Sequence, residues 1–143
     1  AKEKEIVKEQ VKTSILKIEK TIKFYTNKLN LLLGDCIVIG FSQGGMMTFE
    51  LGNHLTDQLR ALAILSGRIL TKDPITNLKL LNTPIFISHG DQDEVLPIDN
   101  FKQSIKYLKS HKCNFESHSL EGDTHIISPK TINLLQKFIK KNL

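Results

Sequence analysis

The stretch IVIGFSQGGMM, residues 37–47, joins a buried strand directly to a helix. It carries glycines two positions before and two positions after Ser42, at Gly40 and Gly44. So sharp a strand-to-helix turn holds the serine in a strained backbone conformation, and side chains at the flanking positions would collide with neighbouring backbone. We therefore predict that the turn lifts the Ser42 hydroxyl clear of the sheet. The N–H of Gln43, at the start of the helix, is then placed to donate to a developing oxyanion.

Strand and helix patterns alternate along the rest of the chain. Apolar runs predict strands, and apolar residues at spacings of three and four predict helices. The predicted strands are residues 36–41, 60–65, 85–88 and 114–120. The predicted helices are residues 6–29, 46–55 and 97–110 and one that begins at Pro129. Residues 68–83 are predicted as loop, with a short turn or helix that starts at Asp73-Pro74 and ends before Asn82. The last helix is expected to bury Ile132, Leu135, Phe138 and Ile139. This alternation indicates the α/β class, a parallel sheet between helices, with its chemistry at the carboxyl ends of the strands.

Length and composition favour one intracellular domain. The 143 residues fit a single domain over 1–143, with neither an internal repeat nor a linker. No apolar run approaches the roughly 18 residues that span a bilayer, and the charged first 30 residues exclude a secretory signal. Two cysteines are too few for a disulfide framework. We therefore predict no membrane span and a cytoplasmic location. Because the chain begins with Ala1 in a charged helical pattern, we expect it to be the inside of something longer.

The net charge of +5 raises the question of nucleic-acid binding. Eight lysines lie along residues 2–28 at helical spacing among four glutamates. No aromatic-rich strand accompanies them to form a platform for stacked bases. We interpret the lysines as a solvated basic face, and predict that nucleic acid is not a partner.

A serine hydroxyl is a poor nucleophile until a base takes its proton and an acid orients that base. His125 lies in the loop between the last strand and the last helix, and it completes the order Ser, acid, His that is typical of this architecture. We predict that His125 is the base. The other four histidines are interpreted as structural or solvated: His54, His89, His111 and His118.

The acid is expected in the segment HGDQDEVLP, residues 89–97. Asp91, Asp93 and Glu94 lie together there, and their spacing does not choose among them. A solvated acidic turn is the alternative interpretation of the same residues.

Four motifs together resemble one known family: GFSQGGMM at 40–47, LSG at 65–67, HGDQDEVLP at 89–97, and TH at 124–125 followed by IISP. They are similar to those of the bacterial carboxylesterase and acyl-protein thioesterase family of α/β-hydrolases, also called the phospholipase/carboxylesterase family. The resemblance covers residues 5–143 and implies an α/β-hydrolase fold. It implies that Ser42 is the nucleophile, Asp93 the acid and His125 the base, since Asp91 falls on a variable position of the family pattern.

The chain departs from the family pattern in two places. Thr124 occupies the position directly before the histidine where the family has glycine, and Gly122 lies three residues before His125. In addition, residues 1–33 contain neither the N-terminal strands nor the H-G-x-G-type loop that supplies the second oxyanion donor in the family. Loss of one such donor lowers turnover on the order of 100- to 1000-fold.

The missing strands have a structural consequence. The strand that precedes Ser42 is expected to become an edge of the sheet, with Ile37 and Ile39 on an exposed face. An open edge favours pairing with another strand, so we expect a homodimer or a missing N-terminal segment there.

The predicted function is a serine hydrolase that cleaves carboxylic esters or thioesters through an acyl-enzyme. Ser42, Asp93 and His125 would act on a small acyl ester or thioester, with the Gln43 N–H in the oxyanion hole and without a metal or organic cofactor. The alternative is a truncated hydrolase remnant, weak or inactive in catalysis, that acts as a partner-dependent module.

Overall fold

The computed structural model describes residues 2–143, with side chains described from Glu5 onward. Ala1, at which the predicted domain begins, lies outside the described residues. With η for a 3₁₀ helix, the described elements follow in the order α1 (Lys2–Lys28), η1 (Leu33–Asp35), β1 (Ile37–Phe41), α2 (Gln43–His54), β2 (Ala61–Leu65), η2 (Leu78–Asn82), β3 (Ile85–Gly90), α3 (Ile98–Ser110), β4 (Phe115–Leu120) and α4 (Pro129–Lys141).

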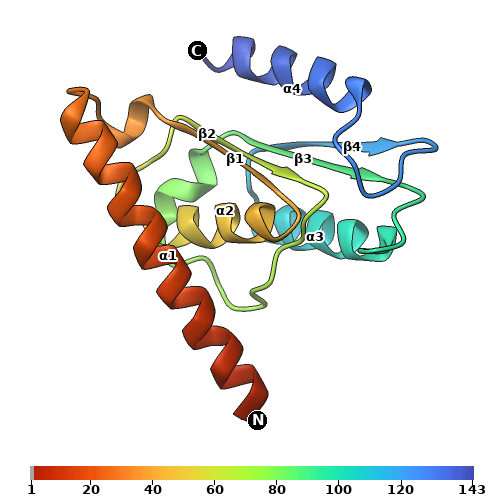
Figure 1. Cartoon of the computed structure of the whole chain (residues 1–143), viewed down its shortest axis with the longest axis horizontal. Coiled ribbons are helices and arrows are strands. Elements are labelled where there is room, and N and C mark those ends of the chain that lie inside the picture. The colour runs from red at the N-terminus through yellow and green to blue at the C-terminus, as the bar shows by residue number, and fades with distance from the viewer. Residues whose placement is uncertain (1) are drawn as a thin grey trace.

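The strands form one parallel sheet in the order β1-β2-β3-β4. The register pairs Gly40 with Ile64 and Ile64 with Ile87. Helices α2 and α3 lie on one face of the sheet and α4 lies on the other, while α1 packs across α2 (Figure 1). The predicted α/β class, with a parallel sheet between helices, is confirmed.

The two central strands, β2 and β3, are buried along their whole length. Their successive side chains point to opposite faces and so contribute to two apolar layers. The layer beneath α2 and α3 contains Phe49, Leu62, Ile64, Ile69, Leu80, Ile85, Ile87, Phe101 and Leu108. The layer beneath α4 contains Ala61, Ala63, Leu65, Phe86, Leu135 and Phe138. Packing on both faces fixes the carboxyl ends of these strands, where the site lies.

Strand β1 is an edge of the sheet, as the sequence predicted, and β4 is the opposite edge. Its outer side has no neighbouring strand among the described residues. Ile39 is 44% exposed and Phe41 is 36% exposed. An edge of this kind leaves a row of backbone N–H and C=O groups without strand partners.

The apolar stripe of α1 is buried only in its middle. Ile15 packs with Leu51 of α2 and with Leu55, directly after that helix. Val7 and Leu29, near the two ends of α1, are more than half exposed. Among the described helices, none has the length and apolar character needed to cross a bilayer.

Two sequence predictions about helices were wrong in detail. Helix α2 begins at Gln43 rather than at residue 46, because the glycines after Ser42 form its first turn. In α4, Ile132 is exposed rather than buried. The buried face runs through Thr131 and Leu135, and the residue after Thr131 is rotated by about 100° around the helix axis.

Candidate active site

Ser42 occupies the turn between β1 and α2 in a strained conformation, with φ 56° and ψ −120°. Positive φ is uncommon for a residue with a side chain, so the prediction of a strained serine is confirmed. The N–H of Ser42 donates to the carbonyl of Leu65 at 2.8 Å. This bond ties the turn to the end of β2 and holds the serine at the carboxyl edge of the sheet.

Close packing around the turn depends on glycines, but not on all of those that the sequence indicated. A Cβ at Gly40 would collide with the carbonyl of Gly44 and lie 2.5 Å from Thr48 Oγ1. A Cβ at Gly67 would lie 2.8 Å from the Ser42 carbonyl oxygen, which explains the glycine of the LSG motif. At Gly44, in contrast, nothing outside its chain neighbours and the backbone of its own helix lies within 4 Å of such a Cβ. The prediction that a side chain at position 44 would collide with neighbouring backbone was therefore wrong.

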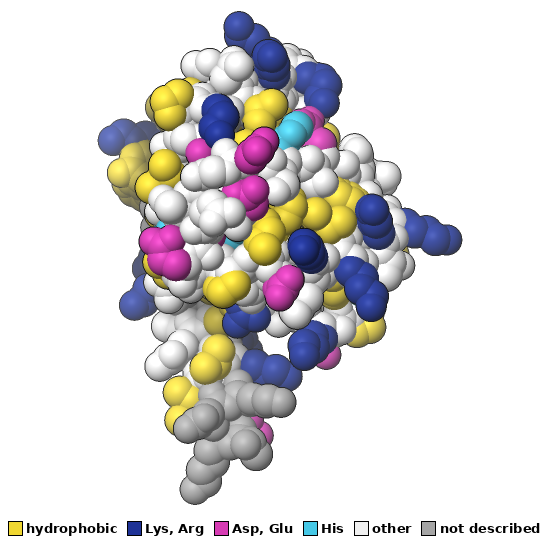
Figure 2. Space-filling view, turned by 90° about the vertical axis from the view of Figure 1, so that its right-hand side faces the viewer, with side chains coloured by type: hydrophobic (Ala, Val, Ile, Leu, Met, Phe, Trp, Pro, Cys, Tyr) yellow, Lys and Arg dark blue, Asp and Glu magenta, His cyan; other side chains and the backbone are white. Residues whose placement is uncertain are grey.

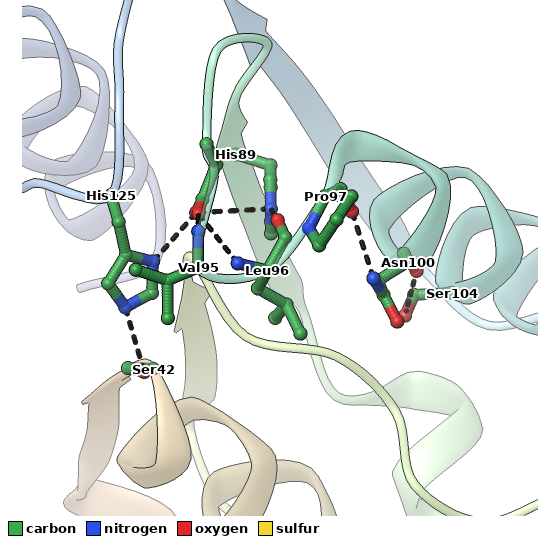
Figure 3. A network of polar contacts seen from close by, with 9 residues as sticks. Ser42, His89, Val95, Leu96, Pro97, Asn100, Ser104 and His125 are labelled. Carbon is green, nitrogen blue, oxygen red and sulfur yellow. Dashed lines mark hydrogen bonds and ion pairs between the residues drawn. The ribbon is translucent and has the colours of Figure 1, made fainter.

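His125 lies between Ser42 and Asp93 and is bonded to both (Figure 3). Its Nδ1 is 2.7 Å from Asp93 Oδ2, and its Nε2 is 2.9 Å from Ser42 Oγ. A carboxylate only accepts hydrogen bonds, so Nδ1 carries the proton and Nε2 is left to accept from the serine hydroxyl. This arrangement suits proton transfer from Ser42.

The carboxylate of Asp93 has no exposed side-chain surface. Its Oδ1 accepts from the N–H groups of Val95 at 2.9 Å and Leu96 at 2.7 Å. Burial alone would raise the pKa of Asp93, but the Leu96 N–H and the ring of His125 outweigh it, and the pKa lies below its usual value. A carboxylate of this kind stays ionised beside the imidazole.

The three carboxylates of the acidic turn have different partners. Only Asp93 contacts the ring of His125. Asp91 Oδ1 instead accepts from the N–H of Gly122 at 2.8 Å, and Glu94 is exposed.

The position of the loop that carries His125 depends on two glycines, Gly122 within the loop and Gly90 at the end of β3. Gly122 takes a positive φ of 78°, which favours glycine, whereas Thr124, directly before His125, does not have a positive φ. A Cβ at Gly90, the last residue of β3, would collide with the carbonyls of Asp123 and Thr124. Absence of a side chain at Gly90 therefore allows the loop to lie against β3.

Two residues near the site were missed by sequence reasoning. Phe41 packs against the ring of His125, with centroids 5.0 Å apart. His89, interpreted above as structural or solvated, is fully buried beside Asp93, with Nε2 3.3 Å from Oδ2. Both could have been recognised from their positions in the sequence, because Phe41 directly precedes Ser42 and His89 begins the motif that contains Asp93.

Apolar side chains gather in the middle of the face at the carboxyl ends of the strands, between acidic and basic groups (Figure 2). Four exposed apolar residues lie next to the bonded groups in sequence: Phe41, Val95, Ile126 and Ile127. Such a surface is suited to the hydrocarbon part of an acyl group. Among the side chains that the structure describes, from Glu5 onward, no group of three or more His, Cys, Asp or Glu is placed to hold a metal ion.

Comparison with known proteins gives a consistent match. The family model described as Phospholipase/Carboxylesterase matches residues 1–143. Acyl-protein thioesterase 1 homolog 1 of Dictyostelium discoideum is 32% identical over 128 residues, which are 88% of this chain and 57% of that protein. Acyl-protein thioesterase 1 of Saccharomyces cerevisiae is 32% identical over 135 residues, which are 91% of this chain and 59% of that protein.

The fold is also found among solved structures. The crystal structure of Arabidopsis thaliana SOBER1 superposes with a TM-score of 0.83 at 22% identity, covering 92% of this chain and 64% of that one. The predicted α/β-hydrolase fold is confirmed in this part. The chain spans less than two thirds of the length of each of these proteins.

Proposed function

Since this chain belongs to the phospholipase/carboxylesterase family, we propose that it is a serine hydrolase that cleaves carboxylic esters or thioesters. The observation that carries the proposal is the continuous hydrogen-bonded chain from Ser42 through His125 to Asp93. The names of the relatives, acyl-protein thioesterases, support the same class of reaction.

The proposed reaction has two halves. The hydroxyl of Ser42 attacks the acyl carbonyl while its proton passes to His125 Nε2. The tetrahedral intermediate then expels the alcohol or thiol, which takes that proton, and an acyl-enzyme remains. In the second half His125 takes a proton from water, the resulting hydroxide attacks the acyl-enzyme, and the carboxylic acid leaves as Ser42 regains its proton.

Two groups stabilise charge in this mechanism. Asp93 keeps the imidazole in the tautomer with its proton on Nδ1, and stabilises the imidazolium that forms. Gln43 is the first residue of α2, so its N–H has no acceptor within the helix. That N–H is the proposed donor to the oxyanion.

A second candidate function is a hydrolase remnant that acts as a partner-dependent module. The open edge of β1 favours it. In either case we propose that the β1 edge is covered by a second copy or by an N-terminal segment outside these residues.

The two functions differ in what happens at Ser42. A fluorophosphonate probe should label Ser42 in the wild type and leave the Ser42→Ala variant unlabelled; labelling that persists in the variant contradicts the proposed nucleophile. Hydrolysis of p-nitrophenyl acetate then measures turnover. A rate at least tenfold lower in Ser42→Ala supports the enzyme, whereas equal rates support the remnant.

A further inference from the structure

His89 is the next-to-last residue of β3, and its ring is fully buried. Nε2 of the ring lies 2.6 Å from the carbonyl oxygen of Leu96 and 3.3 Å from Oδ2 of Asp93. The ring thus faces the turn that holds the proposed acid, on the side away from His125 (Figure 3).

The hydrogen bonds of His89 fix its tautomer. A carbonyl oxygen only accepts, so the proton lies on Nε2 and is donated to Leu96, with the carboxylate of Asp93 as a second, longer contact. Nδ1 is buried and has no partner among the described atoms. The ring also packs against Phe101, with centroids 5.7 Å apart and planes inclined by 31°. The Nε2–H group is therefore the single hydrogen-bond donor of the His89 ring toward the turn.

That N–H acts on the residue that also holds Asp93, Leu96. Leu96 donates its own N–H to Asp93 Oδ1 and gives its carbonyl to His89. If this partly buried carbonyl lost its donor, Leu96 would shift to find another, because an unpaired carbonyl is costly away from water. The N–H that Leu96 donates to Oδ1 is joined to this carbonyl through the Leu96 Cα, so a shift of the residue would displace it, and Oδ2 would lose its geometry toward His125.

We propose that His89 is a positioning residue, whose single N–H fastens the 93–97 turn so that Asp93 presents Oδ2 to His125. The inference rests on the proposed function, because it assigns His89 a task within that site. On this proposal His89 does more than fill space in the core. The position of Asp93 depends on the Nε2–H donor of His89 rather than on the volume of its ring.

Two variants distinguish the effect of losing the hydrogen-bond donor from the effect of losing the imidazole ring. In glutamine the amide nitrogen lies as many bonds from Cα as Nε2 does, so His89→Gln keeps a donor that reaches Leu96. In asparagine the amide nitrogen is one bond closer, in the position of Nδ1, so His89→Asn keeps polarity and loses the reach. His118→Leu is the matched control, since His118 is a half-buried histidine of β4 that bonds Glu116 at 2.7 Å and packs on Phe86.

Two measurements are made on each variant. One is the rate at which a fluorophosphonate labels Ser42. The other is the low-field proton resonance of His125 Nδ1–H, which is deshielded by its short bond to Asp93 and is assigned by its loss in His125→Asn. We expect labelling to slow on the order of 10- to 100-fold in His89→Asn, as displaced reacting groups do. The resonance should shift upfield or broaden in the same variant.

His89→Gln and His118→Leu should keep the wild-type resonance and most of the labelling rate. The inference is overturned if the asparagine and glutamine variants behave alike, or if His118→Leu moves the resonance as far as His89→Asn does. If the wild type itself is not labelled, the proposed function fails. The resonance then still decides the inference, because it reports the bond between Asp93 and His125 without any reaction.

Discussion

Asp91 accepts a hydrogen bond of 2.8 Å from the N–H of Gly122, which joins the turn that carries Asp93 to the loop that carries His125. The two segments are 31 residues apart in sequence. The same connection is reinforced by the N–H of Gln92, which donates to the carbonyl of Asp123 at 2.9 Å. Two of the three acidic residues that the sequence could not distinguish thus have separate tasks.

The first prediction concerns this connection. In Asp91→Ala the Gly122 N–H loses its acceptor, so we expect the His125 loop to loosen and Ser42 labelling to slow several-fold, in line with a loss of about 1 kcal/mol for one hydrogen bond. Asp91→Asn keeps an acceptor oxygen and should lose less. The control is Glu94→Ala, which removes an exposed acid from the same turn. Equal labelling rates for Asp91→Ala and Glu94→Ala would contradict a role of the hydrogen bond between Asp91 and Gly122.

The second prediction compares two glycines beside the serine. Gly40→Ala places a methyl group against the Gly44 carbonyl and Thr48 Oγ1, and overpacking of this kind costs about 1–3 kcal/mol. Gly44→Ala enters open space and restricts the unfolded chain, so its free energy of unfolding should be equal to the wild type or up to about 1 kcal/mol higher. Urea unfolding monitored by circular dichroism measures both. Equal destabilisation of the two variants would contradict the packing described for the turn.

The third prediction is a dependence of stability on pH. The folded pKa of Asp93 is depressed, so its carboxylate contributes stability that is fully present above the unfolded value of about 3.9. This contribution is lost as pH falls below about 4 toward the folded pKa, where the folded state also takes up the proton. Asp93→Asn has no proton to take up there, so its free energy of unfolding should fall less steeply with acid.

The comparison requires urea unfolding of wild type and Asp93→Asn at several pH values between about 6 and 3, where an Asp with a depressed pKa acts. The slope against pH is the quantity of interest, because the substitution also removes hydrogen bonds and lowers stability at every pH. Parallel slopes would show that the Asp93 carboxylate is not held in its charged form.

The fourth prediction concerns the open edge. A lysine on an edge strand discourages pairing with another strand, so Ile39→Lys should reduce the fraction of dimer and larger species in light scattering after gel filtration. Ile132→Lys is matched to it in exposure, at 43% against 44% for Ile39, but lies on α4. An equal effect of the two lysines would indicate general solubility rather than closure of the β1 edge.

Much of the fold was within reach of the sequence, because its signals are local. The apolar runs that became β1, β2, β3 and β4 are separated by helical patterns, and such alternation admits few arrangements other than a parallel sheet. The errors were also local. The first turn of α2 and the outward side chain of Ile132 depend on which face of a helix meets the sheet, and a periodic pattern fixes that face only to within a residue.

For the site, the sequence by itself determined the serine turn, since strain at Ser42 and glycine at position 40 are properties of a few neighbouring residues. Tertiary structure decided the rest. It brought Ser42, Asp93 and His125 into one hydrogen-bonded chain, gave Asp91 to the loop, and buried His89 behind the acid. The physical reason is that hydrogen bonds act over about 3 Å in space, whereas these partners lie up to 83 residues apart along the chain. These residues come into contact only when the strands that precede them pack side by side in the folded sheet.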